Sequence, residues 1–215
     1  GPGQFVFWHQ TFEEYLAAVA LVDEGDDSLL LNRATDRAFR EVFQLALGEI
    51  ALVQAEPERA HRLVRALLTD GGSAMEPVNH RRLRVAASSV SEQSWMEPEL
   101  ANEILCRLAE LLQHQPYAPL VSELTTALAS RPNLTPTTRL VCALLPLLLT
   151  TRFRHGGNGR LRHHVLRVLL NGPEHIPDAD QLFETLMSTA EEQELRTLAA
   201  IGLFRMGRRS VRVLI

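Results

Sequence analysis

The sequence predicts an all-α protein built as an α-solenoid, an array of antiparallel helix pairs, with one short strand near the N-terminus. Three observations support this fold class. Apolar residues recur at intervals of three or four in nearly every segment, which is the period of an amphipathic helix. Clusters of Pro, Gly and Asn interrupt these segments at the lengths expected of ordinary helices. Only residues 4–9 have the β-like pattern of a strand.

After this strand, the expected helices follow one another through the whole chain. In order, they span residues 11–22, 34–53, 57–68, 78–90, 98–113, 118–129, 136–153, 160–170, 179–187 and 191–206. Helices of this length with short connections, and without a second strand pattern, favour stacked antiparallel pairs over a mixed α/β fold. Four or five such pairs fit the length of the chain.

Local signals mark where several of these helices begin and end. A proline fits the first turn, where its missing N–H costs nothing, and three expected helices have one there: Pro57, Pro98 and Pro136. Thr11-x-x-Glu14 and Thr189-x-x-Glu192 match the capping box, in which two side chains satisfy free N–H groups at a helix start. Gly25 marks the end of the first helix.

Two segments share a pattern of an arginine followed by paired small residues, which lets neighbouring helices approach closely. They are LRVAASSV at 83–90 and LRTLAAIGL at 195–203. The surrounding stretch, residues 194–211, resembles a HEAT repeat, with Leu195, Ala199 and Leu203 before another apolar segment. The resemblance implies that the helical array is HEAT-like.

Composition excludes several classes of function. The formal charge of −4 gives no general attraction to nucleic acid, and the longest apolar run, residues 140–149, is far shorter than the roughly 20 residues of a membrane helix. We therefore expect neither nucleic acid nor a membrane as a partner. All basic side chains are arginines, so the chain offers no P-loop or Schiff-base lysine. Cys106 and Cys142 stand among apolar neighbours like structural thiols, which predicts a cytoplasmic protein.

Two groups of arginines are candidate partner-binding sites. The first is Arg81, Arg82 and Arg84; the second is Arg152, Arg154, Arg160 and Arg162, around the glycine-rich segment 155–159. Such basic segments can hold a phosphate or an acidic partner. The alternative is a solvated surface whose arginines neutralise a helix terminus. The spacing of His155, His163, His164 and His175 does not favour a metal site, and no set of acid, base or nucleophile converges.

The stretch FVFWHQTFEEYLAA at residues 5–18 resembles a signature of NACHT-type STAND NTPases. In that family the signature closes the winged-helix region after the nucleotide-binding domain, and its histidine reaches the phosphates of bound ADP. The resemblance implies this role for His9. Glu13 replaces the usual glutamine, which puts an amide contact there in doubt. We expect a capped helix with a buried stripe made of Phe12, Tyr15, Leu16 and Val19.

The resemblance implies a domain organisation and a function. Residues 1–29 would end the winged-helix region, and residues 30–215 would form the HEAT-like array. The chain would be a non-catalytic sensor and regulatory region of an intracellular signalling NTPase. It would need no cofactor of its own, whereas the parent protein would bind ATP and ADP. Its partners would be the upstream NACHT domain and an unknown protein or ligand on the array. The alternative is a free-standing helical scaffold for protein–protein interaction.

Overall fold

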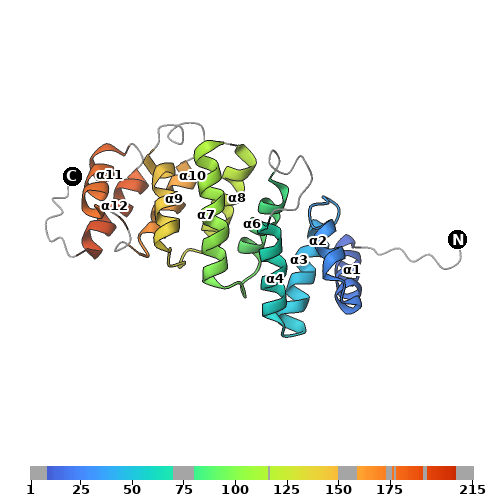
Figure 1. The fold of residues 1–215 in the computed structure, drawn as a ribbon. Coiled ribbons are helices and arrows are strands. Elements are labelled where there is room, and N and C mark those ends of the chain that lie inside the picture. The colour runs from blue at the N-terminus through green and yellow to red at the C-terminus, as the bar shows by residue number, and fades with distance from the viewer. Residues whose placement is uncertain are drawn as a thin grey trace, which may run out of the picture. The chain divides into compact units, whose positions relative to one another are not determined.

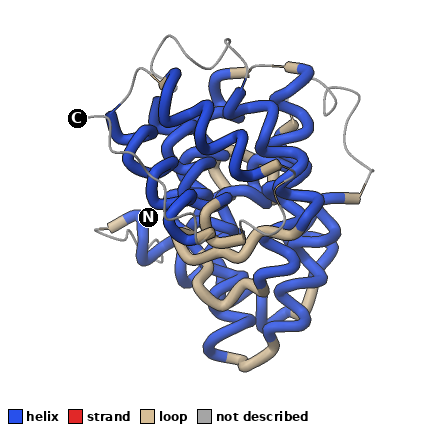
Figure 2. The backbone as a smooth tube through the Cα atoms, turned by 90° about the vertical axis from the view of Figure 1, so that its left-hand side faces the viewer, coloured by secondary structure: helices blue, strands red, loops and turns tan. Residues whose placement is uncertain are grey.

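The computed structural model describes residues 9–69, 80–115, 117–149, 159–172, 176, 178–190 and 193–206. Over these ranges the chain forms eleven α-helices and one π-helical segment, η1, joined by loops, and no strand occurs in them (Figure 2). The all-α class is therefore confirmed. The predicted strand falls outside the described residues except for His9, whose backbone is extended at φ −125° and ψ 123° directly before the first helix.

The chain divides into two compact units, unit 1 (Gly1–Leu100) and unit 2 (Ala101–Ile215). The helices of unit 1 are α1 (Gln10–Glu24), α2 (Asp27–Arg33), α3 (Arg40–Gly48), η1 (Glu49–Val53), α4 (Pro57–Leu68) and α6 (Arg81–Glu92) (Figure 1). Within it α1 packs on α3, and α4 packs on α6. Fully buried apolar side chains such as Leu30, Phe43, Leu47 and Ile50 form its core.

Two local signals in unit 1, Gly25 and Pro57, act as predicted, and a third, Asp26, was not predicted. Gly25 ends α1 in the left-handed conformation, with φ 70°. Asp26 caps α2 by accepting the N–H of Leu29 at 3.0 Å. Pro57 occupies the first turn of α4, as predicted. The sequence analysis did not expect α2 itself, because its acidic start is also what a solvated turn looks like.

Unit 2 begins within α7 (Pro98–His114) and continues through α8 (Ala118–Ser130), α9 (Thr138–Leu149), α10 (Gly159–Leu169), α11 (Ala179–Thr189) and α12 (Gln193–Arg205). Helix α10 contacts α8, α9 and α12, and α12 also packs on α11. Gly202 allows α12 to lie close to Phe183 of α11 and to Leu170, which follows α10. A Cβ at position 202 would lie 2.8 Å from atoms of both residues.

Several expected helix starts are wrong. The helix expected at 34–53 begins only at Arg40, since residues 34–39 form turns, and the helix expected at 136 begins at Thr138. The capping box expected at Thr11 does not form. Helix α1 begins before Thr11, so the Glu14 carboxylate accepts a hydrogen bond from the Gln10 side chain at 2.7 Å instead. Thr189 is the last residue of α11, and the other member of the second expected capping box, Glu192, lies outside the described residues.

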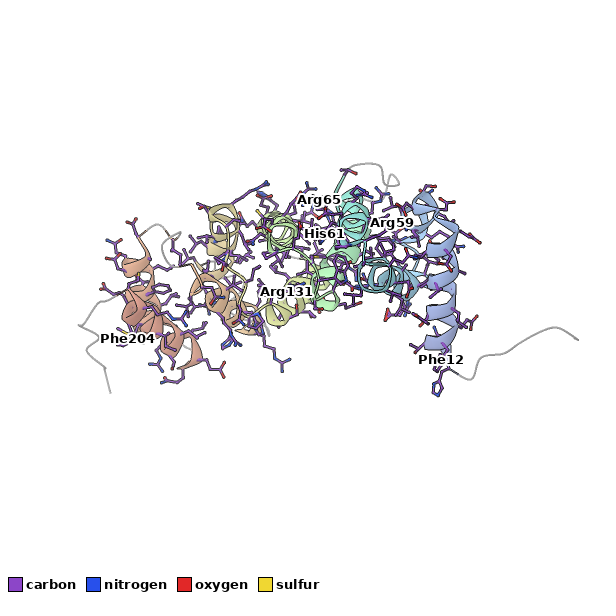
Figure 3. The ribbon with its side chains drawn as sticks, turned by 90° about the horizontal axis from the view of Figure 1, so that it is seen from below. Phe12, Arg59, His61, Arg65, Arg131 and Phe204 are labelled. Carbon is purple, nitrogen blue, oxygen red and sulfur yellow. The ribbon has the colours of Figure 1, made fainter. Side chains whose placement is uncertain are left out.

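The predicted buried stripe of α1 is also wrong. Phe12, Tyr15 and Leu16 are 62%, 41% and 47% exposed, whereas the buried positions of this helix are Ala18 and Val22. Apolar residues occur on both faces of α1, so periodicity alone could not decide which face meets α3. Figure 3 shows Phe12 near the first turn of α1. The Tyr15 hydroxyl donates to the carboxylate of Glu49 at 3.2 Å, and this bond raises the pKa of Tyr15.

Candidate anion-binding site

A cavity of about 380 Å³ opens in unit 1 between the turn that follows α2 and the first turns of α6. Its lining consists of Ala34, Thr35, Asp36, Arg37, Arg40, Arg81, Arg84 and Val85. Four of these eight residues are arginines. We call this cavity the arginine pocket. The volume lies within the usual range of small-molecule sites.

The first wall of the arginine pocket is the tight turn between α2 and α3. The N–H of Asp36 donates to the carbonyl of Arg33 at 2.9 Å, and the N–H of Phe39 donates to the carbonyl of Asp36 at 3.0 Å. The Arg33 guanidinium lies 5.3 Å from the centre of the Phe39 ring and also pairs with the Asp36 carboxylate at 3.3 Å. These contacts fold the turn so that Arg37 and Arg40 line the same cavity.

The second wall is the start of α6. Arg81 is its first residue and Arg84 follows three positions later, so both side chains project from one face of the helix. Arg82 lies between them but turns away, because its Nη1 donates to the carbonyl of Thr69 at 3.3 Å. The two pocket arginines of α6 therefore oppose the two of the α2–α3 turn.

A serine connects the two walls. Arg40 donates through Nη2 to the hydroxyl of Ser88, a residue that is 2% exposed on α6. The Ser88 hydroxyl donates in turn to the carbonyl of Arg84 at 3.1 Å. This arrangement fixes the guanidinium of Arg40 relative to the second wall, so part of the pocket is organised before any ligand enters.

The electrostatics of the arginine pocket favour an anion. Arginine stays charged at any physiological pH, and its planar fork of N–H donors matches carboxylate and phosphate oxygens. Among the described residues of the lining, four are arginines and one, Asp36, carries a carboxylate, so guanidinium groups outnumber carboxylates there. The N-terminal ends of α3 and α6, at Arg40 and Arg81, also adjoin the pocket, and the positive end of each helix dipole adds to the attraction.

The structure separates the arginines that the sequence grouped. Arg81 and Arg84 line the pocket, whereas Arg82 does not. Sequence reasoning missed Arg37 and Arg40, although their three-residue spacing is the signal that could have found them. In unit 2, Arg160 lines a separate cavity of about 340 Å³ together with hydroxyl-bearing residues of α8: Ser122, Thr125 and Thr126.

Two further predictions for the second arginine group meet different outcomes. Arg162 is 4% exposed and donates through Nε to the carbonyl of Leu148 at 3.3 Å, so the prediction that it is a surface partner-binding residue is wrong. Its side chain links α10 to the end of α9. Arg152 and Arg154 lie outside the described residues.

His9 is exposed immediately before α1, and its role in binding ADP stays a prediction.

Three potential metal ligands come together in unit 1, namely Glu58 and His61 of α4 and Glu97 before α7, with ligand atoms within 4.8 Å of one another. Figure 3 labels His61 among the side chains of α4. The imidazole does not suit a metal, because its Nε2 accepts the N–H of Glu97 at 3.3 Å, which places the ring proton on Nδ1. That Nδ1 lies 3.6 Å from the Glu97 carboxylate. We interpret the cluster as a polar link between α4 and the start of α7.

The histidines singled out in the sequence include an adjacent pair on α10. The rings of His163 and His164 lie edge to face with their centres 5.4 Å apart, and His163 Nδ1 lies 3.3 Å from the Glu194 carboxylate. Burial is the main cause that lowers the pKa of His164. His155 and His175 lie outside the described residues.

Comparisons with known proteins bear on the fold alone. No protein-family model and no curated protein matches the chain. The crystal structure of an engineered protein from the Northeast Structural Genomics Consortium resembles it with a TM-score of 0.52 and 16% identity, over 90% of this chain and 84% of that chain. At this identity the likeness concerns the fold alone. Among the described helices, none combines the length and the apolar character that crossing a bilayer requires.

Proposed function

We propose that this chain is a non-catalytic recognition and regulatory region of a cytoplasmic NACHT-type signalling NTPase, with a HEAT-like helical array that captures a ligand or partner. The observation that supports the NTPase assignment is the stretch FVFWHQTFEEYLAA at residues 5–18. His9 has extended backbone and α1 begins at the next residue, an arrangement compatible with a histidine delivered by a strand to the start of a helix.

The exposed face of α1 also supports a neighbouring domain. Tyr15 and Leu16 follow Phe12 by three and four positions, and all three side chains are more than 40% exposed. Contiguous apolar residues on one helix face commonly mark an interaction surface. In the proposed parent protein, the nucleotide-binding part would cover this face, and ligand capture by the array would loosen that contact and permit exchange of ADP for ATP.

The arginine pocket supports the recognition half of the proposal. A fixed Arg40, a cavity of about 380 Å³ and a lining rich in guanidinium groups suit capture of an anionic group. The described residues of the pocket's lining include no serine, cysteine or histidine. The pocket therefore fits a binding role better than a catalytic one.

The substitution His9→Ala in the complete parent protein tests the regulatory role. We expect the variant to retain less ADP after purification and to signal more strongly without a stimulus. The matched control is His114→Ala, which changes an exposed histidine at the end of α7. Unchanged ADP content and unchanged basal activity in a folded His9→Ala protein would contradict the proposal.

The second candidate is a free-standing helical scaffold that binds a partner protein. The arginine pocket supports this scaffold as well as it supports the NTPase region. Its described lining residues all belong to unit 1, so the pocket is formed without an upstream domain. The intact mass of the native gene product separates the two candidates. A polypeptide several hundred residues longer with a P-loop upstream supports the NTPase region, whereas a mass near 24.1 kDa supports the scaffold.

A further inference from the structure

We propose that the arginine pocket of unit 1 binds a small molecule that carries a diphosphate group, two linked phosphoryl groups held between the α2–α3 turn and the start of α6. The inference deepens the recognition function proposed above and rests on it for its biological meaning. The binding itself can be tested on this chain alone.

The size of the pocket argues for more than one phosphoryl group. A volume of about 380 Å³ is many times the roughly 10 to 15 Å³ that one ordered water requires. A single phosphate ion, with five non-hydrogen atoms, would leave much of this space to water. Two linked phosphoryl groups would reach both arginine walls at once.

The charge of the lining argues in the same direction. Each phosphoryl group carries roughly 1.5 to 2 negative charges near pH 7. A ligand with two such groups suits a lining whose described residues include four arginines and one carboxylate, that of Asp36. Arg37 and Arg81 are exposed on the two opposed walls. Their planar guanidinium groups suit a compact ligand that presents many acceptor oxygens.

The same features disfavour an acidic peptide. Successive carboxylates along an extended chain are separated by about 3.3 Å per residue and alternate in direction, so few of them would enter one cavity. The peptide would also bring backbone N–H groups to a lining made mostly of donors. Donors facing donors would leave polar groups unsatisfied, which costs binding energy.

Isothermal titration of this chain with inorganic pyrophosphate is the direct test, with orthophosphate and a short glutamate peptide as comparison ligands. We expect pyrophosphate to bind at least tenfold more tightly than orthophosphate, and its affinity to fall as salt is added. Titration with ADP then identifies the source of the group. Equal affinities for ADP and pyrophosphate would mean that the diphosphate suffices, and tighter ADP binding would point to a nucleotide.

Two exposed arginines provide variants that keep the fold. The double substitution Arg37→Gln and Arg81→Gln removes one guanidinium from each wall, at positions that are both exposed. We expect at least a tenfold loss of pyrophosphate affinity with an unchanged circular dichroism spectrum. The matched control is Arg82→Gln, which removes the same charge from α6 but outside the pocket. Asp36→Asn should act in the opposite direction and tighten binding.

Three results would overturn the inference. They are no binding of pyrophosphate at millimolar concentration, equal losses for Arg82→Gln and the double variant, and tighter binding of the glutamate peptide than of pyrophosphate. None of these results changes what the His9→Ala experiment in the parent protein would show about ADP retention and basal signalling. Failure of the diphosphate site is therefore distinguishable from failure of the proposed regulatory function.

Discussion

Arg40 and Ser88 form a side-chain hydrogen bond that joins α3 to α6 beside the arginine pocket. Because Ser88 also donates to the carbonyl of Arg84 at 3.1 Å, a single hydroxyl positions one arginine and contacts the backbone of another. A charged side chain that is already held in place loses less conformational freedom when a ligand binds. Ser88 is therefore a positioning residue that contributes to affinity without touching the ligand.

Substitution of Ser88 by alanine should weaken pyrophosphate binding severalfold, although the charge of the pocket is unchanged. The loss of both hydrogen bonds of this hydroxyl, with Arg40 and with the carbonyl of Arg84, should also lower the free energy of unfolding by about 1 to 3 kcal/mol. Titration and urea unfolding measure the two effects. Ser91→Ala is the control, because the Ser91 hydroxyl bonds only to carbonyls of its own helix, at 3.0 Å and 3.4 Å. If the control weakens binding as much as Ser88→Ala does, the positioning role is wrong.

Gly202→Ala should destabilise unit 2. A Cβ at this position would lie 2.8 Å from Leu170 Cδ2 and from Phe183 Cε2, and the Phe183 ring is fully buried and cannot swing into solvent. Overpacking costs about 1 to 3 kcal/mol, and the better helix propensity of alanine offsets up to about 1 kcal/mol of it. We expect a net loss of about 1 to 2 kcal/mol in chemical unfolding.

Gly48→Ala is the matched control for that experiment. Its added Cβ would meet only the side-chain oxygen of Gln93, at an ordinary distance of 3.8 Å. The substitution should keep or slightly raise the stability, because alanine favours the helix. Equal destabilisation by Gly48→Ala and Gly202→Ala would show that close packing at Gly202 is not the cause.

Cys106 should resist thiol reagents in the native protein. Burial, with a smaller contribution from its hydrogen bond to Glu110, raises the pKa of this thiol to about 11, so almost none of it is thiolate at pH 8. Cys142 is exposed and should react. A disulfide-exchange reagent at pH 8 should therefore detect one thiol in the folded chain and two in denaturant. In a Cys142→Ser variant the native signal should disappear, and rapid reaction of Cys106 would contradict the prediction.

His164 should make the chain less stable in mild acid. Burial lowers its pKa from an ordinary value of 6.5, with smaller effects of the nearby charges of His163, Arg167 and Arg160. As the pH falls through 6.5 the unfolded chain takes up a proton that the folded chain resists, so the free energy of unfolding falls. We expect His164→Gln to lose less stability than the wild type between pH 7.5 and 5.5 in urea unfolding. Equal losses would rule out this contribution.

The sequence predicted those helices whose start and apolar period agree. Helix α4 is the clearest case, because Pro57 sets its first turn and its apolar face is strongly periodic. Helix α2 was not predicted, because a helix of seven residues is not stable alone and so has only a weak sequence pattern. In the structure Arg59 of α4 holds it through Asp27, with Nη2 and Oδ1 2.8 Å apart. Such a contact between distant segments has no local signal.

The candidate site was predicted only in part for a similar reason. The cluster that contains Arg81 and Arg84 is visible in the sequence, but a cavity exists only where two segments meet. The first wall depends on the turn at 34–39, which the sequence presents as the first part of a helix because Ala34, Phe39 and Val42 suggest a helical period. Side-chain contacts of Arg33 with Phe39 and Asp36 favour the turn instead.

The π-helical segment η1 (Glu49–Val53) has a consequence for how related chains would compare with this one. A π-helical turn closes its hydrogen bond one residue later than an α-helical turn does, as in the bond from the N–H of Gln54 to the carbonyl of Glu49 at 3.0 Å. The segment therefore absorbs one extra residue between α3 and α4 while both flanking helices keep their packing. A descendant of the same ancestor that lacks one residue here would fold the same way, and its alignment would show a single gap at this place.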